Sequence, residues 1–390
     1  MNEKYVVELT KAERLSKLYT TSIEPSQRAR KETPMFGSLS LSILLLLFVG
    51  AAAAVWIAGI RLSDTTDVLS ERFGLGEALG GLILLAIATN LPEIAITSSA
   101  ALSDNLGVAT GNILGGIAIQ TVVLVALDAF GVGGSHPLTY RAASLMLVLE
   151  GALVIAVLTV AIMGTQLPAS LIFGRVAPGD LLIALLWMFG LWLLGKARTD
   201  LPWQEKGDAP GGQEAPRGHS KAQKDREASG KGVSTARTAI VFFVAAVVTL
   251  AAGVVLEESG GAIASRIGMS GVLFGSTFLA AATALPEVST GLTSVRLGDY
   301  KLAVSDIFGG NAFLSVLFLL ASLLSGRAAL PQAQNTDIYL TGLGILLTAV
   351  YVWGLVFRPH RRFLRMGVDS LAVLVLYLLG VAGLVAVAYG

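Results

Sequence analysis

Two copies of one short motif each place a glutamate inside a long apolar segment. Residues 86–93 read Ala-Ile-Ala-Thr-Asn-Leu-Pro-Glu, and residues 280–287 read Ala-Ala-Ala-Thr-Ala-Leu-Pro-Glu. A charge in the apolar core of a bilayer costs roughly 3 kcal/mol on insertion scales, so an acid in such a segment indicates a function. Because Glu93 and Glu287 have the same threonine and proline beside them, the pair predicts an intramembrane cation site.

The neighbours of both glutamates add oxygen ligands. Proline lacks the amide hydrogen and clashes with the carbonyl four residues back, so Pro92 and Pro286 are predicted to kink or break their helices. The carbonyls released in this way need partners inside a membrane, and a cation is one. Thr89 and Thr283 lie four residues before the glutamates, on the same face of an intact helix. Hard cations such as Ca²⁺ take roughly six to eight oxygens, which two such halves could supply.

A second apolar segment after each motif carries further polar residues. Asn112 and Asp306 both lie 19 residues past their glutamates. They are either ligands that face the kinks or caps at the start of a helix, and Asp306 would be a third acid near the site. Gln120 lies two turns further on, and Glu150 is either a proton-relay acid or is paired with a neighbour. The candidate metal ligands are therefore Glu93, Glu287, Thr89, Thr283, Asp306 and Asn112, with Asn90, Gln120, Ala86, Ala280 and Glu150 as additional candidates.

The elements that must position these residues are membrane-spanning helices. The chain has 390 residues, 54% of them hydrophobic, and a mean hydropathy of +0.72, which is too apolar for an ordinary soluble protein. Apolar runs of about 20 residues indicate spans. We predict an all-α polytopic membrane protein with ten spans, at residues 39–60, 77–101, 106–130, 142–164, 178–196, 237–257, 271–295, 301–324, 337–357 and 367–389.

The two motif regions are copies of one another. Alignment of residues 80–120 with 274–314 gives 13 identities in 41 positions at a constant offset of 194, including Thr-x-Leu-Pro-Glu and a Gly-Gly pair. Five spans per copy is an odd number, so the second copy enters the membrane from the opposite side, as in inverted-repeat transporters. The predicted divisions are a polar N-terminal tail at 1–38, a first five-helix repeat at 39–196, a flexible linker at 197–236 and a second five-helix repeat at 237–390.

Composition excludes several kinds of site. The chain has no cysteine and only three histidines, all in predicted loops, so thiolate chemistry is absent and a zinc site is not expected. The net charge of +1 suggests no nucleic-acid partner, and the expected surroundings are a lipid bilayer. Lysine and arginine concentrate on the side of the linker and of Arg358, Arg361, Arg362 and Arg365, so we expect this side to be cytoplasmic in a plasma (inner) membrane and the N-terminus to be outside.

Four further acids lie at the ends of predicted spans, where contact with water is the expectation. They are Glu257, Glu258, Asp337 and Asp369.

The motif pattern resembles the α-repeats of the cation/Ca²⁺ antiporter superfamily, which includes Na⁺/Ca²⁺ and H⁺/Ca²⁺ exchangers. The resemblance covers two blocks of about 40 residues and the ten-span layout. It implies a site enclosed by spans 2, 3, 7 and 8, with Ca²⁺ on Glu93 and Glu287 and with Thr89 and Thr283 assisting.

The chain departs from the sodium-coupled members of that superfamily. Their Gly-Thr-Ser is replaced by Ala-Thr-Asn at 88–90 and Ala-Thr-Ala at 282–284, and their Gly-Ser by Gly-Gly at 115–116 and 309–310. Gln120 and Leu314 stand where an Asn or Asp is usual. Sodium sites in the superfamily use the lost hydroxyls, whereas proton coupling needs only the acids.

The sequence thus predicts a secondary-active antiporter, not an enzyme, which exchanges Ca²⁺ for Na⁺ or H⁺ without a cofactor. A cation channel would use the same acids but would conduct without exchange. A membrane scaffold or sensor derived from the same fold would accommodate the lost hydroxyls.

Overall fold

Apolar helices make up most of the part of the chain that the computed structural model describes, residues 36–72, 87–133, 136–199 and 234–390. Residues 41–390 form one structural unit. Its first half contains α2 (Leu41–Arg72), α4 (Leu91–Leu102), α5 (Leu106–Ala126) with its π-helical continuation η2 (Leu127–Gly131), α6 (Leu138–Ala142), α7 (Leu145–Thr165), the 3-10 turn η3 (Ala169–Leu171) and α8 (Pro178–Thr199).

The second half also begins with a long helix and contains the following elements. These are α10 (Thr235–Ile267), α11 (Gly271–Phe274), the π-helix η4 (Gly275–Leu279), α12 (Ala280–Thr283), α13 (Leu285–Arg296), α14 (Tyr300–Leu314), α15 (Leu317–Ser325), the 3-10 turn η5 (Leu330–Gln332), α16 (Asn335–Phe357), a hairpin of β1 (Arg362–Phe363) and β2 (Met366–Gly367), and α17 (Val368–Tyr389).

The described residues include eight helices that are long and apolar enough to cross a membrane. A ninth is present if the bent pair Gly271–Thr283 and Leu285–Arg296 forms one span. The all-α membrane class predicted from the sequence is confirmed, whereas ten spans remain a prediction. The predicted span at 77–101 is represented by α4, which has 12 residues, and its residues 77–86 lie outside the described part. Residues 1–35 of the predicted tail and residues 200–233 of the predicted linker also lie outside the described part.

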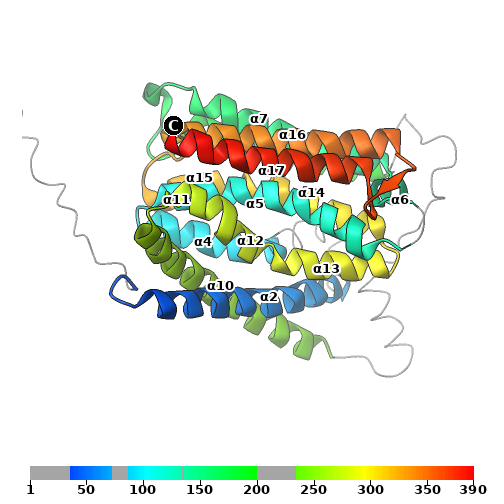
Figure 1. Cartoon of the computed structure of the whole chain (residues 1–390), viewed down its shortest axis with the longest axis horizontal. Helices are drawn as coiled ribbons and strands as arrows, with labels where there is room; N and C mark the ends of the chain where they lie inside the picture. The colour runs from blue at the N-terminus through cyan, green and yellow to red at the C-terminus, as the bar shows by residue number, and fades with distance from the viewer. Residues whose placement is uncertain (1–35, 73–86, 134–135, 200–233) are drawn as a thin grey trace, which may run out of the picture. The chain divides into compact units, whose positions relative to one another are not determined.

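The first helix of each half is longer than the hydropathy pattern predicts. The predicted spans are 39–60 and 237–257, but α2 has 32 residues and α10 has 33. Helices of this length reach about 50 Å and must tilt within an apolar core of about 30 Å. They continue past the apolar run because polar residues there pack against the protein, as Ser63 and Ser259 do. Figure 1 shows α2 and α10 side by side next to α4 and α13.

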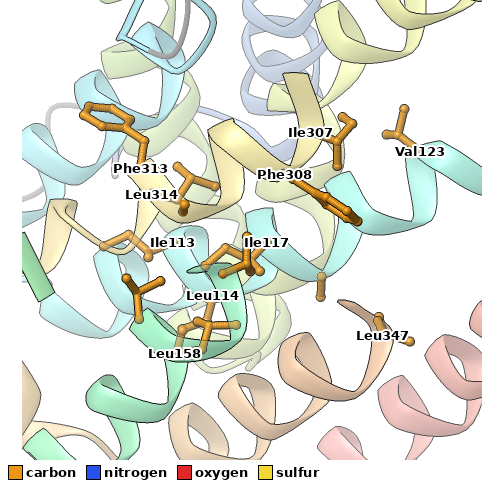
Figure 2. Close-up of a cluster of buried hydrophobic side chains, with 14 of the residues drawn as sticks. Ile113, Leu114, Ile117, Val123, Leu158, Ile307, Phe308, Phe313, Leu314 and Leu347 are labelled. Carbon is orange, nitrogen blue, oxygen red and sulfur yellow. The ribbon is translucent and has the colours of Figure 1, made fainter. Parts of the chain in front are cut away.

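The core lies where α5 and α14 pack between the motif helices and α7 and α16. Figure 2 shows the apolar side chains of α5 and α14 meeting those of α7 and α16, as with Leu158 and Leu347. Glycines bring α5 onto the backbone of the second half. A Cβ added at Gly111 would lie 2.6 Å from the carbonyl oxygen of Val272, and one at Gly115 would overlap Ser276. Only glycine therefore permits this approach.

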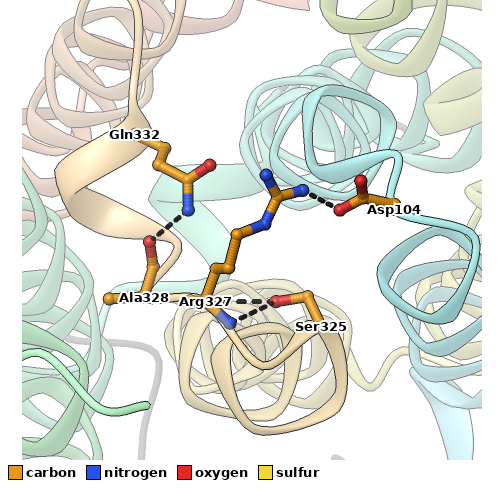
Figure 3. Close-up of polar contacts among 5 residues, drawn as sticks. All are labelled: Asp104, Ser325, Arg327, Ala328 and Gln332. Atoms are coloured by element: carbon orange, nitrogen blue, oxygen red, sulfur yellow. Dashed lines mark hydrogen bonds and ion pairs between the residues drawn. The ribbon is translucent and has the colours of Figure 1, made fainter. Parts of the chain in front are cut away.

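Apolar side chains cover the outer helices, as expected of surfaces that face lipid. Leu46 on α2 is 74% exposed and Phe243 on α10 is 68% exposed. The two halves also meet outside the core, where Arg327 after α15 forms an exposed ion pair with Asp104 of the loop before α5 (Figure 3). Exposed pairs of this kind contribute about 0–1 kcal/mol.

Candidate functional site

Both copies of the motif interrupt a helix. Asn90 precedes α4 and Ala284 precedes α13, and in each case the proline occupies the first turn of the new helix, where its missing amide hydrogen is tolerated. The helices on either side of Ala284 are bent by 42°. The structure therefore confirms the predicted break, and it places both glutamates in the first turn of a helix. The positive end of the helix dipole favours a carboxylate there.

Glu93 is fully buried and contacts both halves of the chain. Its Oε1 accepts a hydrogen bond of 3.4 Å from Nε2 of Gln120 on α5. The side chain of Thr283, which belongs to the second motif, also reaches this carboxylate. The expectation that a threonine shares a face with its own glutamate holds for an intact helix, and the helix is broken between Thr283 and Glu287. Thr283 of the second motif instead contacts Glu93 of the first.

Glu287 is 4% exposed and lacks a polar contact like that of Glu93. Both of its carboxylate oxygens are without a hydrogen-bond partner among the described residues, as is Oε2 of Glu93. The carboxylate lies close enough to Glu93 and to Asp306 for their negative charges to repel it. Buried adjacent carboxylates without donors are costly, so the arrangement calls for a bound cation or for protons.

The neutral amide side chains of Asn90 and Gln120 lie near Glu93 and the second half. A Cβ added at Gly310 on α14 would lie 3.3 Å from Nδ2 of Asn90 and 3.4 Å from Oε1 of Gln120. The additional candidates Asn90 and Gln120 therefore converge on the second half, at the Gly-Gly pair of α14. Asn90 also donates to Oγ1 of Thr89, at 3.4 Å.

Asn112 and Asp306 do not cap their helices. The N-cap of α5 is Asn105, and the N-cap of α14 is Asp299, whose side chain accepts from the amide of Leu302 at 3.2 Å. The capping alternative is therefore wrong for both residues. Asn112 is completely buried beside η4, and neither polar atom of its side chain has a hydrogen-bond partner among the described residues.

Glu150 lies on α7 and is 5% exposed. It lines a cavity of about 40 Å³ together with Asp306 and Gly310, so this cavity adjoins the glutamate site through α14. A volume of this size holds a few water molecules.

Of the two alanines proposed as carbonyl ligands, the structure describes only Ala280. The carbonyl oxygen of Ala280 already accepts from Oγ1 of Thr283 and from the amide of Ala284, both at 3.1 Å. Ala86 lies outside the described residues. The described part of the chain contains no group of three or more His, Asp or Glu side chains arranged to hold a metal, so a cation at Glu93 and Glu287 would also need neutral oxygens.

Sequence reasoning missed Asn311, which follows Gly310 and is fully buried. Its amide donates to Oγ1 of Thr121 at 3.1 Å, and its Oδ1 has no partner among the described residues. The signal was the Gly-Gly-Asn sequence 24 residues past Glu287. The repeat comparison passed over it because Ile117 occupies the matching position.

Three acids that were expected to contact water are buried. Glu257 accepts from Oγ of Ser99 at 2.8 Å, because α10 continues ten residues past this position. Asp337 caps α16 by accepting from the amide of Gln334 at 2.7 Å, and Asp369 turns inward at the start of α17.

Comparison with known proteins gives consistent matches along most of the chain. The family model described as sodium/calcium exchanger protein matches residues 43–195 and 237–386. Inner membrane protein YrbG of Escherichia coli (strain K12) is 26% identical over 309 residues, which cover 79% of this chain and 88% of YrbG.

Two solved structures show the same fold. The crystal structure of the H⁺/Ca²⁺ exchanger CAX has a TM-score of 0.63 and 15% identity, and the match covers 88% of this chain and 82% of CAX. The sodium-calcium exchanger NCX_Mj has a TM-score of 0.54 and 16% identity, and the match covers 88% of this chain and 99% of NCX_Mj.

Proposed function

Because the chain belongs to the sodium/calcium exchanger family, we propose that it is a secondary-active antiporter that exchanges Ca²⁺ for H⁺ or Na⁺ and binds these ions on Glu93 and Glu287. One observation carries the proposal. Two buried glutamates from the two halves lie close together, and three of their four oxygens have no hydrogen-bond partner among the described residues. Carboxylate and amide oxygens are the ligands that Ca²⁺ prefers.

Exchange is obligatory because the empty site is costly. Two ionised carboxylates that repel each other in a buried site need either a divalent cation or protons before the halves rearrange. Ca²⁺ and the counter-ion therefore compete for the same carboxylates. Binding of one ion accompanies release of the other on each side of the membrane.

We favour H⁺ as the counter-ion. Ala284, Gly116 and Gly310 stand where sodium-coupled relatives are expected to carry hydroxyls, so the site offers few oxygens for separate Na⁺ ions. Protons need only the two carboxylates. The name of the structural neighbour CAX, an H⁺/Ca²⁺ exchanger, supports the same choice.

Alternating access would come from movement of α2 and α10 over the motif helices. A Cβ added at Gly59 on α2 would lie 2.5 Å from Cγ of Pro286, and one added at Gly253 on α10 would lie 2.6 Å from Cβ of Ala95 and 3.2 Å from the carbonyl oxygen of Pro92. Each long helix thus packs with a glycine against the motif of the other half. In this proposal the N-terminus is outside the cell and the linker is cytoplasmic.

Ca²⁺ flux in proteoliposomes tests the proposal. We expect an imposed pH gradient to drive Ca²⁺ against its own gradient, and the double variant Glu93→Gln/Glu287→Gln to be inactive. Flux driven by Na⁺ alone would overturn the choice of H⁺ but keep the antiporter. If neither the pH gradient nor the Na⁺ gradient drives saturable Ca²⁺ exchange, the proposal is contradicted. Ca²⁺ conduction that needs no counter-ion would favour a channel. A scaffold or sensor would move no Ca²⁺ at all.

A further inference from the structure

A second pair of buried acids lies at the end of the bundle where α5, α16 and the linker-side loops meet. Asp128 in η2 is fully buried and Asp369 at the start of α17 is 7% exposed. The two carboxylates are close enough to repel each other. Neither residue is a candidate ligand of the Glu93 and Glu287 site, and the proposed exchange mechanism uses neither.

The two carboxylates differ in their partners. Asp128 accepts three hydrogen bonds, from the amides of Leu138 at 2.8 Å and Gly367 at 2.6 Å and from Oγ of Ser370 at 2.8 Å. Three donors stabilise an ionised carboxylate. The oxygens of Asp369 form no hydrogen bond of ordinary geometry with the described residues, although the backbone amides of Asp369 and Ser370 lie near them. The hydroxyl of Thr139 on α6, which is 1% exposed, faces Asp369 without a hydrogen bond of ordinary geometry.

We propose that Asp369 is a proton-binding site, with Asp128 as the fixed anion beside it. An ionised Asp369 would be a buried charge next to a second negative charge, and none of the donors around it forms a hydrogen bond of ordinary geometry. This arrangement is costly. A protonated Asp369 removes the repulsion and adds an O–H donor to the cluster.

The surroundings favour a proton over a metal ion. The oxygens of Asp128 are occupied by N–H and O–H donors. The Cα atoms of Gly354 and Gly367 press against the Asp369 carboxylate so closely that a Cβ at either position would overlap it. A Ca²⁺ ion needs roughly six or more oxygens around it, which this enclosure does not offer.

Other titratable and charged groups near the pair lie on α16, on β1 and in the adjoining loops. Tyr351 on α16 donates to Oγ of Ser370 at 3.2 Å, and Arg362 on β1 donates to the carbonyl oxygen of Asp128 at 3.0 Å. His136 and His360 stack around Tyr140 in the adjoining loops. The helices α5 and α11, which also pack against α17, carry no titratable side chain.

The opposite end of the bundle shows what the second carboxylate adds. Asp180 at the start of α8 accepts from Oγ of Ser322 at 2.7 Å and from the amide of Ala177 at 3.2 Å. Ser322 lies 194 residues after Asp128, the offset of the repeat. At that end, one carboxylate and one serine are enough to hold the packed helix ends together. A second carboxylate, such as Asp128, is therefore not needed for this packing alone.

The residues before and after Asp128 in η2 touch the helix of Glu287. A Cβ added at Gly291 on α13 would lie 2.7 Å from Leu127 of η2, and one at Gly131 would lie 3.0 Å from Val295. A rearrangement of η2 on loss of the proton from Asp369 would therefore reach the end of α13. We expect transport to depend on the pH of the linker-side solution through this site, separately from exchange at Glu93 and Glu287.

Infrared difference spectroscopy on the purified full-length chain tests the proposal without relying on transport. We expect the carbonyl band of a protonated, buried carboxyl group to persist in Glu93→Gln/Glu287→Gln and to be lost in Asp369→Asn. A wild-type spectrum that Asp369→Asn leaves unchanged would overturn the proposal. Failure of the exchange proposal would leave this result intact.

Asp128→Ser is a second test in case Asp369→Asn does not fold. It introduces at position 128 the serine that Ser322 provides at the opposite end. With its like-charged neighbour removed, Asp369 should lose most of its carboxyl band at neutral pH. Asp180→Asn is the matched control and should keep the band. A full band in Asp128→Ser at neutral pH would contradict the role of Asp128.

Discussion

The two halves of the candidate site share a backbone but not an environment. In both, the helix breaks before Leu-Pro-Glu and restarts with the glutamate in its first turn. Glu93 receives a hydrogen bond from Gln120 and a contact from Thr283. Glu287 has Leu314 at the position equivalent to Gln120, and both of its oxygens lack partners among the described residues.

The difference indicates that the two glutamates have different roles. A repeat preserves the glycines and prolines that shape the backbone, because a change there alters the whole fold. The polar side chains around the acid can diverge one at a time. In the proposed mechanism, Glu93 is the glutamate held by the protein, and Glu287 would depend on the ion to compensate its charge.

The largest expected effect comes from removing either acid. Glu93→Gln and Glu287→Gln should each reduce Ca²⁺ flux by about 100-fold or more, since loss of one charged ligand removes roughly 3 kcal/mol. Proteoliposome flux measures this. Glu257→Gln is the matched control, because Glu257 is equally buried but bonds to Ser99. Flux in either site variant equal to that of the control would contradict the assignment.

Gln120→Leu should make the first half resemble the second. Losing the bond to a charged group removes about 1.5 kcal/mol, so we expect apparent Ca²⁺ affinity to fall by roughly tenfold. Leu314→Met is the control in the other half and should have little effect, because volume is nearly kept. Equal affinities in the two variants would mean that the asymmetry has no role in binding.

The glycines on the long helices should matter equally in both halves. Gly59→Ala and Gly253→Ala introduce a methyl group against Pro286 and Ala95, which overpacking data place at about 1–3 kcal/mol. We expect slower flux and lower thermal stability. Gly50→Ala and Gly261→Ala lie in open space on the same helices and should have no such cost. Unchanged flux in the first pair would argue against movement over this contact.

The last prediction concerns the stability of the fold and two serines that join the motif helices to the long helices. Ser99 donates to buried Glu257 at 2.8 Å, and Ser289 accepts from exposed Trp56 at 2.6 Å. Ser99→Ala should cost about 1–3 kcal/mol and Ser289→Ala about 0.5 kcal/mol, because only the first leaves a buried charge without its donor. Thermal unfolding compares them, and the reverse order would contradict the burial argument.

Hydropathy predicted the helical class and proline geometry predicted the helix break at each Leu-Pro-Glu, because these follow from local composition and geometry. The family was predicted from the resemblance of the doubled motif. Hydropathy and the repeat did not predict the lengths of α2 and α10, whose polar ends become helical through packing on distant segments. The contact of Thr283 with Glu93 joins residues 190 positions apart. Asn311 escaped notice because the repeat has no equivalent of it. The burial of Asp369 was not predicted because hydropathy placed this residue at a span end. Ligation of ions by the candidate residues remains a prediction.

Calcium binding to the purified protein tests the central claim most directly. Titration calorimetry should show saturable Ca²⁺ binding to the wild type and to Glu257→Gln, with protons released as Ca²⁺ binds. The double variant Glu93→Gln/Glu287→Gln should show neither heat of binding nor proton release. Binding to this variant that equals the wild type would place the ion elsewhere and contradict the account.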